Sequence, residues 1–433
     1  MIQIVRADGS AERAVIDGMR TRADRANRAI DEAAAAIMAD VRARGFEAVR
    51  EYSLRFDGAE PREIPRAELA AARARCPAAL AAALERAAAN IRDYNERLLT
   101  RTMEWTSPDG GVVGRIVRGL SRVGIYVPGG TAAYPSSVLM NAVPARVAGV
   151  EEIVMVTPPT ENLNDAVLAA ADIAGVDRVI AVGGVQAVAA LTYGAGFIPR
   201  VDKLVGPGNA YVAAAKRQAY GALDIDMVAG PSEVLVIADS GADPKFVAAD
   251  LLSQAEHDRL ASAVLLTDSM ELARAVDGEI VRQTGYLSRS EIMEQSLRDF
   301  GCAIVCDSLE RCAALANEIA PEHLEIVTEE PRALLPAIRN AGAVFLGAWS
   351  PEPLGDYLAG PDHVLPTSGT ARFFSPLSVD SFLKTMSIIQ YDRASLAPIR
   401  DQIIALAQVE KLTAHANSIR VRFETAGADK EEV

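Results

Sequence analysis

The chain has 433 residues, half of them hydrophobic, which is enough apolar material for two to four domains. Its 44 Lys and Arg against 58 Asp and Glu give a formal charge of −14, which repels phosphate backbones and argues against nucleic acid as a partner. Four cysteines without a CxxC pair or the density of a secreted disulfide scaffold predict reduced thiols and a cytoplasmic location.

The first quarter of the chain reads as mainly helical. The N-terminus shows no basic region followed by an apolar run, so no signal peptide is expected, and residues 1–25 are interpreted as a polar N-terminal arm. Ala-rich helical sequence follows near 27–56 and in two further stretches separated at Cys76-Pro77, because proline disfavours helix in the residue before it.

From about residue 123, short runs of Val, Ile and Leu alternate with glycine turns and helix-period segments, as in parallel α/β units. The phrases at 148–156 and 174–182 both predict a helix that ends at glycine and leads into a buried strand. The uncharged stretch 179–199 approaches the length of a membrane span, but its glycines and polar residues favour a strand, a turn and a helix, so no membrane partner is expected.

A second alternating series runs from about 234 to 347. The predicted fold is therefore α/β, with two doubly wound, Rossmann-like parallel-sheet domains, one inserted in the other. The smaller, nucleotide-side domain is placed at 126–231, and the larger domain at 26–125 and 232–376. Residues 377–433 are expected to form a helical C-terminal tail.

The four histidines are the first candidates for metal binding or proton transfer, because imidazole is a common metal ligand and titrates near neutrality. Gln254 and His257 are three residues apart at the end of a predicted helix, so they share one face and could form half of a metal site. A capping or core-edge histidine is the alternative, and a lone pair at this spacing favours it.

Two further histidines stand beside acidic residues. Asp356 and His363 frame a loop after a strand, where Asp356 is either an oxygen ligand or a turn aspartate that bonds its own backbone. Glu322 and His323 are adjacent, and His323 has the pKa of a general base for an alcohol. Neighbouring side chains on extended backbone point apart, so a surface pair remains the alternative.

Glycine-rich turns at 127–130, 182–185 and 205–209 each follow a predicted strand, where backbone amides can approach phosphates. None of them completes a dinucleotide fingerprint or a P-loop, so the turns alone argue only weakly for a nucleotide.

Seven phrases taken together resemble one family, histidinol dehydrogenase, in order and rough spacing. The resemblance covers about residues 30–422, and its motifs are specific. They are 123–130 (VGIYVPGG), 206–212 (GPGNAYV), 229–233 (AGPSE), 251–258 (LLSQAEHD), 320–324 (APEHL), 355–367 (GDYLAGPDHVLPT) and 412–415 (LTAH).

The resemblance implies an enzyme that uses zinc, one ion per subunit, and NAD to oxidise L-histidinol through the aldehyde to L-histidine, reducing two NAD. The family's residues carry over to this chain as zinc ligands Gln254, His257, Asp356 and His415; acid–base residues Glu322 and His323; further substrate contacts Ser232 and Glu410; and nucleotide contacts Tyr126, Gln186 and Asn209. Gln254, His257, His323, Asp356 and His415 are also expected to contact the substrate.

The resemblance also implies an intertwined homodimer in which Glu410 and His415 act in the partner's site. Departures from the family pattern are few: Asp362 stands where asparagine is frequent, and Phe373-Phe374 replaces a smaller pair. His363 is interpreted as a loop-ordering residue, and no cysteine falls at a site position. The alternative is a related zinc and NAD dehydrogenase of another polar alcohol, such as a sulfonated propanediol, but Glu410 would face an anionic substrate unfavourably.

Overall fold

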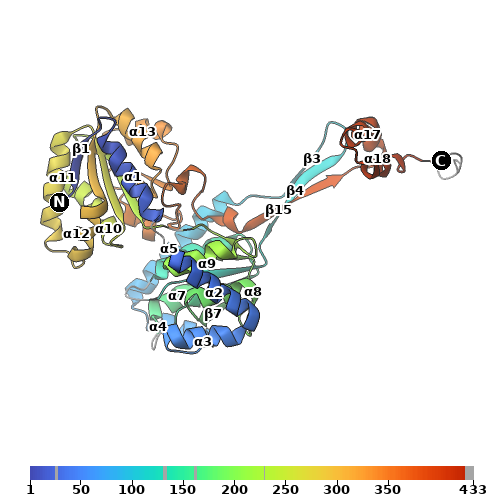
Figure 1. Cartoon of the computed structure of the whole chain (residues 1–433), viewed down its shortest axis with the longest axis horizontal. Helices are drawn as coiled ribbons and strands as arrows, with labels where there is room; N and C mark the ends of the chain where they lie inside the picture. Colours follow the sequence, from blue (N-terminus) through green and yellow to red (C-terminus); the bar gives the residue numbers. More distant parts are fainter. Residues whose placement is uncertain (25–27, 130–133, 160–162, 229, 425–433) are drawn as a thin grey trace. The chain divides into compact units, whose positions relative to one another are not determined.

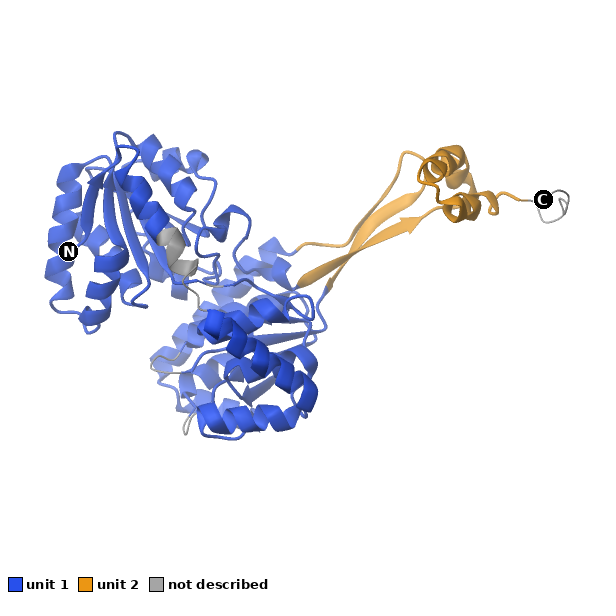
Figure 2. Ribbon diagram, viewed as in Figure 1, with its two compact units in different colours: residues 1–99, 119–382 blue, residues 100–118, 383–433 orange. Residues whose placement is uncertain are grey.

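The computed structural model describes residues 1–24, 28–129, 134–159, 163–228 and 230–424, with the chain coloured along its length in Figure 1. Two compact units are distinguished in Figure 2. Unit 1 comprises Met1–Leu99 and Gly119–Phe382, and unit 2 comprises Thr100–Arg118 and Leu383–Val433.

The first six-stranded sheet of unit 1 has the strand order β2-β7-β6-β5-β8-β9. Its strands from β5 to β9 are parallel, and β2 adds an antiparallel edge through pairing with β7. The strands are β2 (Arg62–Ile64), β5 (Arg122–Tyr126), β6 (Glu152–Thr157), β7 (Arg178–Ala181), β8 (Lys203–Val205) and β9 (Asp224–Ile225).

Helices cover both faces of this sheet. One face packs against α2, α3, α8 and α9 in a single apolar cluster, while α6 and α7 lie on the other face with α4 and α5 against them. These helices are α2 (Arg28–Arg44), α3 (Phe46–Asp57), α4 (Arg66–Arg75), α5 (Ala78–Leu98), α6 (Pro135–Val147), α7 (Asp165–Ala174), α8 (Gly184–Tyr193) and α9 (Ala210–Ala219).

The repeated phrase produces two similar helix-to-strand turns, as predicted. Helix α7 starts at Asn164, whose side chain accepts the N–H of Ala166, and ends at Gly175 with φ of 74°. Gly149 after α6 has φ of 79°. Glycine adopts this left-handed backbone without a Cβ clash, so the chain can turn directly into the next strand.

The second six-stranded sheet of unit 1 is fully parallel, in the order β1-β12-β11-β10-β13-β14. Its strands are β1 (Gln3–Arg6), β10 (Glu233–Ala238), β11 (Ser262–Thr267), β12 (Gly301–Val305), β13 (His323–Val327) and β14 (Ala343–Leu346).

Two buried clusters fill the faces of the second sheet. Helices α10, α11 and α12 contribute to one cluster, and α1, α13 and α14 to the other. Figure 1 shows α11 and α12 on one side of the strands and α1 and α13 on the other. These helices are α1 (Ala11–Asp24), α10 (Pro244–Ala255), α11 (Met270–Thr284), α12 (Ser290–Phe300), α13 (Leu309–Ile319), α14 (Pro331–Leu334) and, beyond β14, α15 (Glu352–Tyr357).

The N-terminal quarter differs from the expected grouping in two ways. Residues 1–25 are not a separate arm, because β1 pairs with β12 and Ile16 of α1 is buried in the core of the second sheet. Residues 28–98 were expected with 232–376, yet their helices pack on α6, α7, α8 and α9, and β2 pairs with β7. Amphipathic helices do not reveal from their own sequence which of two sheets they cover.

Both sheets share one topology. Counting from β5 or from β10, each central run has the strand order 3-2-1-4-5, with one further strand at the edge beside strand 3. The direction of winding therefore reverses between β5 and β8 in the first sheet and between β10 and β13 in the second. Such switch points leave a crevice where ligands bind in open α/β sheets. The two predicted doubly wound sheets are confirmed.

Unit 2 combines a small sheet with helices. Its strands lie in the order β15-β4-β3, and β3 and β4 are antiparallel. The C-terminal tail is thus helical, as expected, but is preceded by β15, which joins two strands from residues before 120. The elements are β3 (Met103–Thr106), β4 (Val112–Gly119), β15 (Leu383–Gln390), α16 (Arg393–Leu396), α17 (Arg400–Val409) and α18 (Thr413–Arg420).

The uncharged stretch 179–199 forms the end of β7, a glycine turn and α8, as the sequence predicted. Across the described ranges, no helix combines the length and the apolar character that a membrane crossing requires.

Candidate active site

The acid–base pair is held at the amino end of the second sheet by the backbone of one residue, Glu233. His323 is the first residue of β13 and pairs in register with Val234 of β10. Glu322 Oε2 accepts the N–H of Glu233 at 2.8 Å, and His323 Nδ1 lies 3.0 Å from the carbonyl oxygen of Glu233. Both side chains are buried, and His323 Nδ1 is 3.6 Å from Glu322 Oε2. The surface-pair alternative is therefore wrong.

This arrangement fixes the tautomer of His323. A carbonyl oxygen can only accept, so Nδ1 carries the proton and donates it to Glu233 O, and Nε2 keeps its lone pair. Burial disfavours the imidazolium form and lowers the pKa of His323 to about 4. The ring is therefore a neutral base with one nitrogen available.

The pKa of Glu322 is shifted in the opposite direction. Burial raises its pKa well above the ordinary value of 4.5, because it disfavours the carboxylate, and the hydrogen bond from the Glu233 N–H works in the other direction. A carboxyl group in this state can accept a proton only after it has ionised, so it becomes a base as pH rises.

A group of possible metal ligands lies beside this pair. One donor atom each from His257, Glu352 and Asp356 fall within 4.8 Å of one another. His257 lies two residues after the end of helix α10, and the two carboxylates are four residues apart in α15. Of the expected zinc ligands, the structure thus brings His257 and Asp356 together. Asp356 is in a helix, so the turn-aspartate alternative is wrong.

Gln254 is placed on the same helical turn as His257, whose N–H donates to the carbonyl of Gln254 at 3.2 Å. Its side chain is fully buried, and neither its Nε2 nor its Oε1 atom has a hydrogen-bond partner in the described structure. A buried amide without partners costs free energy, and native proteins avoid it unless another group supplies the bonds. The orphaned amide therefore fits a ligand that binds here.

His363 orders the segment that carries Asp356, as the sequence predicted. Its Nδ1 lies 3.2 Å from the carbonyl oxygen of Asp356 and 3.6 Å from its Oδ1. Its Nε2 is 3.5 Å from Ser137 Oγ. Asp362 is also buried, where its Oδ1 accepts the N–H of Val364. These contacts hold the chain between α15 and residue 364.

Ser232 immediately precedes Glu233, and its carbonyl oxygen accepts the N–H of Ser262 at 3.0 Å. This bond places Ser232 next to the residue that positions the acid–base pair. Glu410 and His415 belong to unit 2, where Glu410 follows α17 and His415 lies in α18. Both are exposed in the single chain.

The expected nucleotide residues gather at the carboxyl edge of the first sheet. Tyr126 ends β5, and its hydroxyl oxygen accepts the N–H of Gly184 at 3.0 Å. Burial raises the pKa of Tyr126 to about 12, which keeps the phenol neutral. Gln186 lies in the first turn of α8, and its Nε2 donates to Asp57 at 3.2 Å, while its Oε1 has no partner in the described structure.

Asn209 precedes α9 and caps it, because its Oδ1 accepts the N–H groups of Tyr211 and Val212. Gly206 of the same loop has φ of 102°, and a Cβ added there would lie 2.2 Å from the carbonyl oxygen of Tyr126. These contacts bring two of the three glycine turns against the end of β5 at the switch point. Gly130 of the remaining turn and Ala229 of the 229–233 phrase lie outside the described residues.

Sequence reasoning missed three carboxylates in or behind the donor group of His257, Glu352 and Asp356, here called the cation cluster; Glu325 and Glu352 are buried and Asp250 is half-buried. Glu352 stands in the cluster itself, and its N–H donates to Glu325 Oε1 at 2.7 Å. Glu325 shares a hydrogen bond with Asp250 of α10, and burial raises the pKa of Asp250 to about 6. The signal was the four-residue spacing of Glu352 and Asp356, but Pro353 and Gly355 between them do not read as helix.

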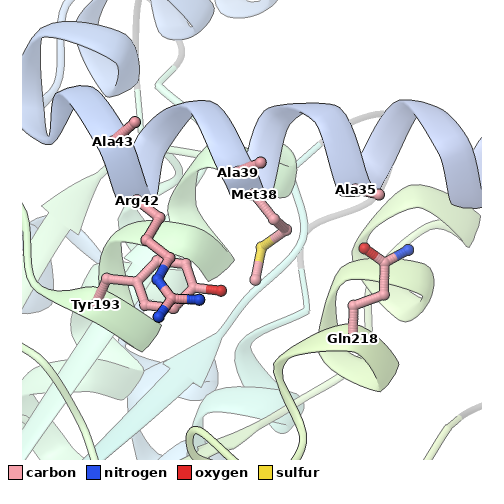
Figure 3. A pocket seen from close by; sticks show the side chains of 7 residues that line it. All are labelled: Ala35, Met38, Ala39, Arg42, Ala43, Tyr193 and Gln218. Carbon is pink, nitrogen blue, oxygen red and sulfur yellow. The ribbon is translucent and has the colours of Figure 1, made fainter.

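A cavity with a volume of about 500 Å³ lies elsewhere, between α2, α8 and α9 (Figure 3). Met38 and Arg42 of α2 face Tyr193 and Gln218 there, and the guanidinium carbon of Arg42 lies 5.5 Å from the centre of the Tyr193 ring. None of the expected site residues lines this cavity, so the chemistry is assigned by side-chain geometry and not by cavity size.

Comparison with known proteins places these features in one family. The family model described as histidinol dehydrogenase matches residues 20–423. A histidinol dehydrogenase of Clostridium acetobutylicum is 50% identical over 428 residues, which are 98% of this chain and 99% of the relative. One from Heliobacterium mobile is 55% identical over 90% of this chain and 93% of the relative. The crystal structure of histidinol dehydrogenase from Elizabethkingia anophelis superimposes with a TM-score of 0.92 at 36% identity, covering 97% of this chain and 98% of that one.

The orphaned amide of Gln254 predicts an unusual effect on stability. Replacing Gln254 by Met, which has a similar length and no polar donor, removes the unsatisfied group and should raise the free energy of unfolding of the chelator-treated protein by about 1 kcal/mol. Thermal melting in chelator measures this change.

Gln283 is the matched control, because it is also a buried glutamine but its Nε2 donates to the carbonyl of Lys245 at 2.9 Å. Gln283→Met should therefore destabilise the protein by about 1 kcal/mol, since it leaves that carbonyl without its donor. Equal losses in both variants would contradict the account of Gln254.

Proposed function

The chain belongs to the histidinol dehydrogenase family, and we propose that the pair Glu322-His323 and the donor cluster beside it oxidise L-histidinol through L-histidinal to L-histidine. This reaction is the four-electron oxidation of an amino alcohol to an amino acid, at the end of histidine biosynthesis. The observation that carries the proposal is the neutral His323, whose free Nε2 is on the same side of the sheet as the cation cluster.

The donor set fits a single Zn²⁺ per subunit. His257 offers an imidazole nitrogen, Asp356 a carboxylate oxygen and Gln254 an amide oxygen that has no other partner. These are ligand types that zinc accepts, and His415 of unit 2 would complete the four. The crowding of buried carboxylates at this point also favours a divalent cation, because buried charges need a partner.

The first sheet fits NAD. Tyr126, the Gly206 turn and the start of α9 at Asn209 lie at its switch point, and Gln186 lies in α8, which follows β7, two strands from β5. Backbone N–H groups at a glycine turn and at the N-terminus of a helix can donate hydrogen bonds to a pyrophosphate. When bound, zinc would hold and polarise the amino alcohol, and NAD would accept a hydride in each half of the reaction.

The chain's own residues move the protons. In the first half, His323 Nε2 takes the hydroxyl proton of the alcohol as the carbinol carbon loses its hydride. Glu233 O then stabilises the imidazolium through Nδ1–H. In the second half, ionised Glu322 takes a proton from water, and the resulting hydroxide adds to the aldehyde carbon. Transfer of a second hydride to NAD then gives the carboxylic acid, which releases its proton to solvent as it ionises to the carboxylate.

Ser232 and Glu410 are proposed as further substrate contacts, with Glu410 accepting the imidazole N–H of histidinol. A homodimer in which Glu410 and His415 serve the partner's site is supported by the surface of unit 2. There Trp105, Ile389, Leu406 and Val409 are more than half exposed. Apolar side chains gathered on one small unit mark a protein interface.

The test of the whole proposal is a count of NADH. Purified enzyme given limiting L-histidinol should release two NADH per substrate, lose this activity after chelation and regain it with Zn²⁺. One NADH per substrate would refute the four-electron reaction. Complete indifference to histidinol, with turnover of another polar alcohol, would favour the related dehydrogenase instead.

Variants of the two proposed catalytic side chains should affect different halves of the reaction. His323→Asn should slow alcohol oxidation, and Glu322→Gln should mainly slow aldehyde oxidation, each by about 10²- to 10⁴-fold. Because burial raises the pKa of Glu322, its carboxylate form increases with pH. Aldehyde oxidation by the wild type should therefore rise with pH, and this rise should be absent in Glu322→Gln. Wild-type rates in both variants would disprove these roles.

The shared site predicts complementation between two inactive variants. If His415 serves the partner, a mixed dimer of His323→Asn and His415→Ala chains has one intact site of its two. Random mixing after unfolding and refolding should then restore roughly a quarter of wild-type activity, since half of the dimers are mixed. If His415 serves its own chain, no mixed dimer has an intact site, and activity stays at the level of the separate variants.

A further inference from the structure

Glu352 lies where the cation cluster and the acid–base pair meet, and the proposed reaction does not use it. Its carboxylate belongs to the donor group with His257 and Asp356 that spans 4.8 Å. Its Oε1 is also 3.8 Å from Nε2 of His323, the nitrogen proposed as the base. Glu352 therefore faces the reacting groups from α15.

The surroundings of Glu352 leave its charge uncompensated. The side chain is 2% exposed, and no Lys or Arg of the described chain forms an ion pair with it. Ser253 Oγ, at 3.5 Å from Oε2, is a distant donor, and that hydroxyl already donates to the carbonyl of Asp250 at 2.8 Å. A buried carboxylate among others needs a cation or a proton to be tolerated.

Gln254 points independently to a ligand at the same place. Its amide is completely buried without a partner in the described structure, and its backbone carbonyl accepts the N–H of His257 at 3.2 Å. The end of α10 and the turn after it therefore carry Gln254 and His257, and α15 carries Glu352 and Asp356. All four belong to unit 1, and none depends on the C-terminal unit.

We propose that Glu352 is a metal-binding carboxylate, so that unit 1 of a single chain holds the cation through Gln254, His257, Glu352 and Asp356 before His415 is supplied. Two carboxylates balance the charge of a divalent ion, and the imidazole and amide complete four protein donors of the types zinc accepts. This inference rests on the proposed function and assigns a residue outside the ligand set carried over from the family.

Two consequences follow for the full-length protein. His415→Ala should still bind one Zn²⁺ or Co²⁺ per chain, because four donors remain. Glu352→Gln should bind either metal at least about 10-fold more weakly than the wild type, because a neutral amide replaces an anionic ligand. Binding is measured on chelator-stripped protein by competition with a chromophoric chelator. The visible absorption of bound Co²⁺ reports whether the ligand set has changed.

Glu256→Gln is the matched control, because it removes one negative charge next to His257 without touching the donor group. It should leave both the affinity and the Co²⁺ spectrum close to those of the wild type. A second variant, Glu352→Asp, keeps the charge but shortens the side chain by one methylene. It should shift the Co²⁺ spectrum and bind metal with an affinity between those of the wild type and Glu352→Gln. This variant tests the inference even if Glu352→Gln does not fold.

The gain in melting temperature on adding metal separates ligation from general damage, since a bound metal stabilises the folded state by mass action. The gain should shrink in Glu352→Gln and persist in Glu256→Gln. Wild-type affinity, spectrum and thermal gain in the folded Glu352 variants would overturn the inference and leave the proposed function standing. If stripped wild-type protein binds neither metal, the zinc-dependent function itself fails, and this assignment falls with it.

Discussion

The parallel pairing of β10 with β13 is the constraint on which the acid–base chemistry depends. It sets the backbone of Glu233 beside Glu322 and His323, where one N–H and one carbonyl fix a carboxyl group and an imidazole tautomer. A slip of one residue in this register would turn His323 to the opposite face of the sheet, because side chains alternate along a strand. Paired strands on both sides make such a slip costly, so the positions of Glu322 and His323 are fixed by the sheet itself.

One topology serves two purposes in this chain. In the first sheet, Tyr126, Gln186 and Asn209 lie at the carboxyl edge of the strands, which is the usual place for a nucleotide. In the second sheet, the acid–base residues lie at the amino edge, because His323 begins β13. His257 lies there too, just after the end of α10. Helix α10 runs back from the carboxyl end of β10, so its last turn returns to the amino edge. Asp356 therefore lies beside His257 and not at a switch point of the carboxyl edge, where the rule for open α/β sheets had led us to expect a ligand site.

The sequence predicted elements that depend on local pattern. The glycine-terminated helix at Gly175, the strand and helix within 179–199 and the two doubly wound sheets were all readable. The packing partners of these elements could not be predicted, because the apolar face of α2 fits either sheet. The sequence of the short strand β1 likewise does not indicate that it pairs with the distant strand β12. In the site, histidine scarcity pointed to His257 and His323. Glu352 was not predicted, because it comes close to these residues only through the folding of a Pro- and Gly-containing segment against α10.

The carboxylates behind the site link the proposed cation to the stability of the fold. Asp250, Glu325 and Glu352 follow one another from α10 through β13 to α15, joined by hydrogen bonds, and burial raises the pKa of each. Protons shared along this chain reduce the repulsion, yet each protonated carboxyl is a weaker ligand than its anion. A cation bound here would therefore compete with the protons for the same oxygens, and binding of one would release the other. A bound cation would therefore stabilise this part of the fold as well as take part in the chemistry.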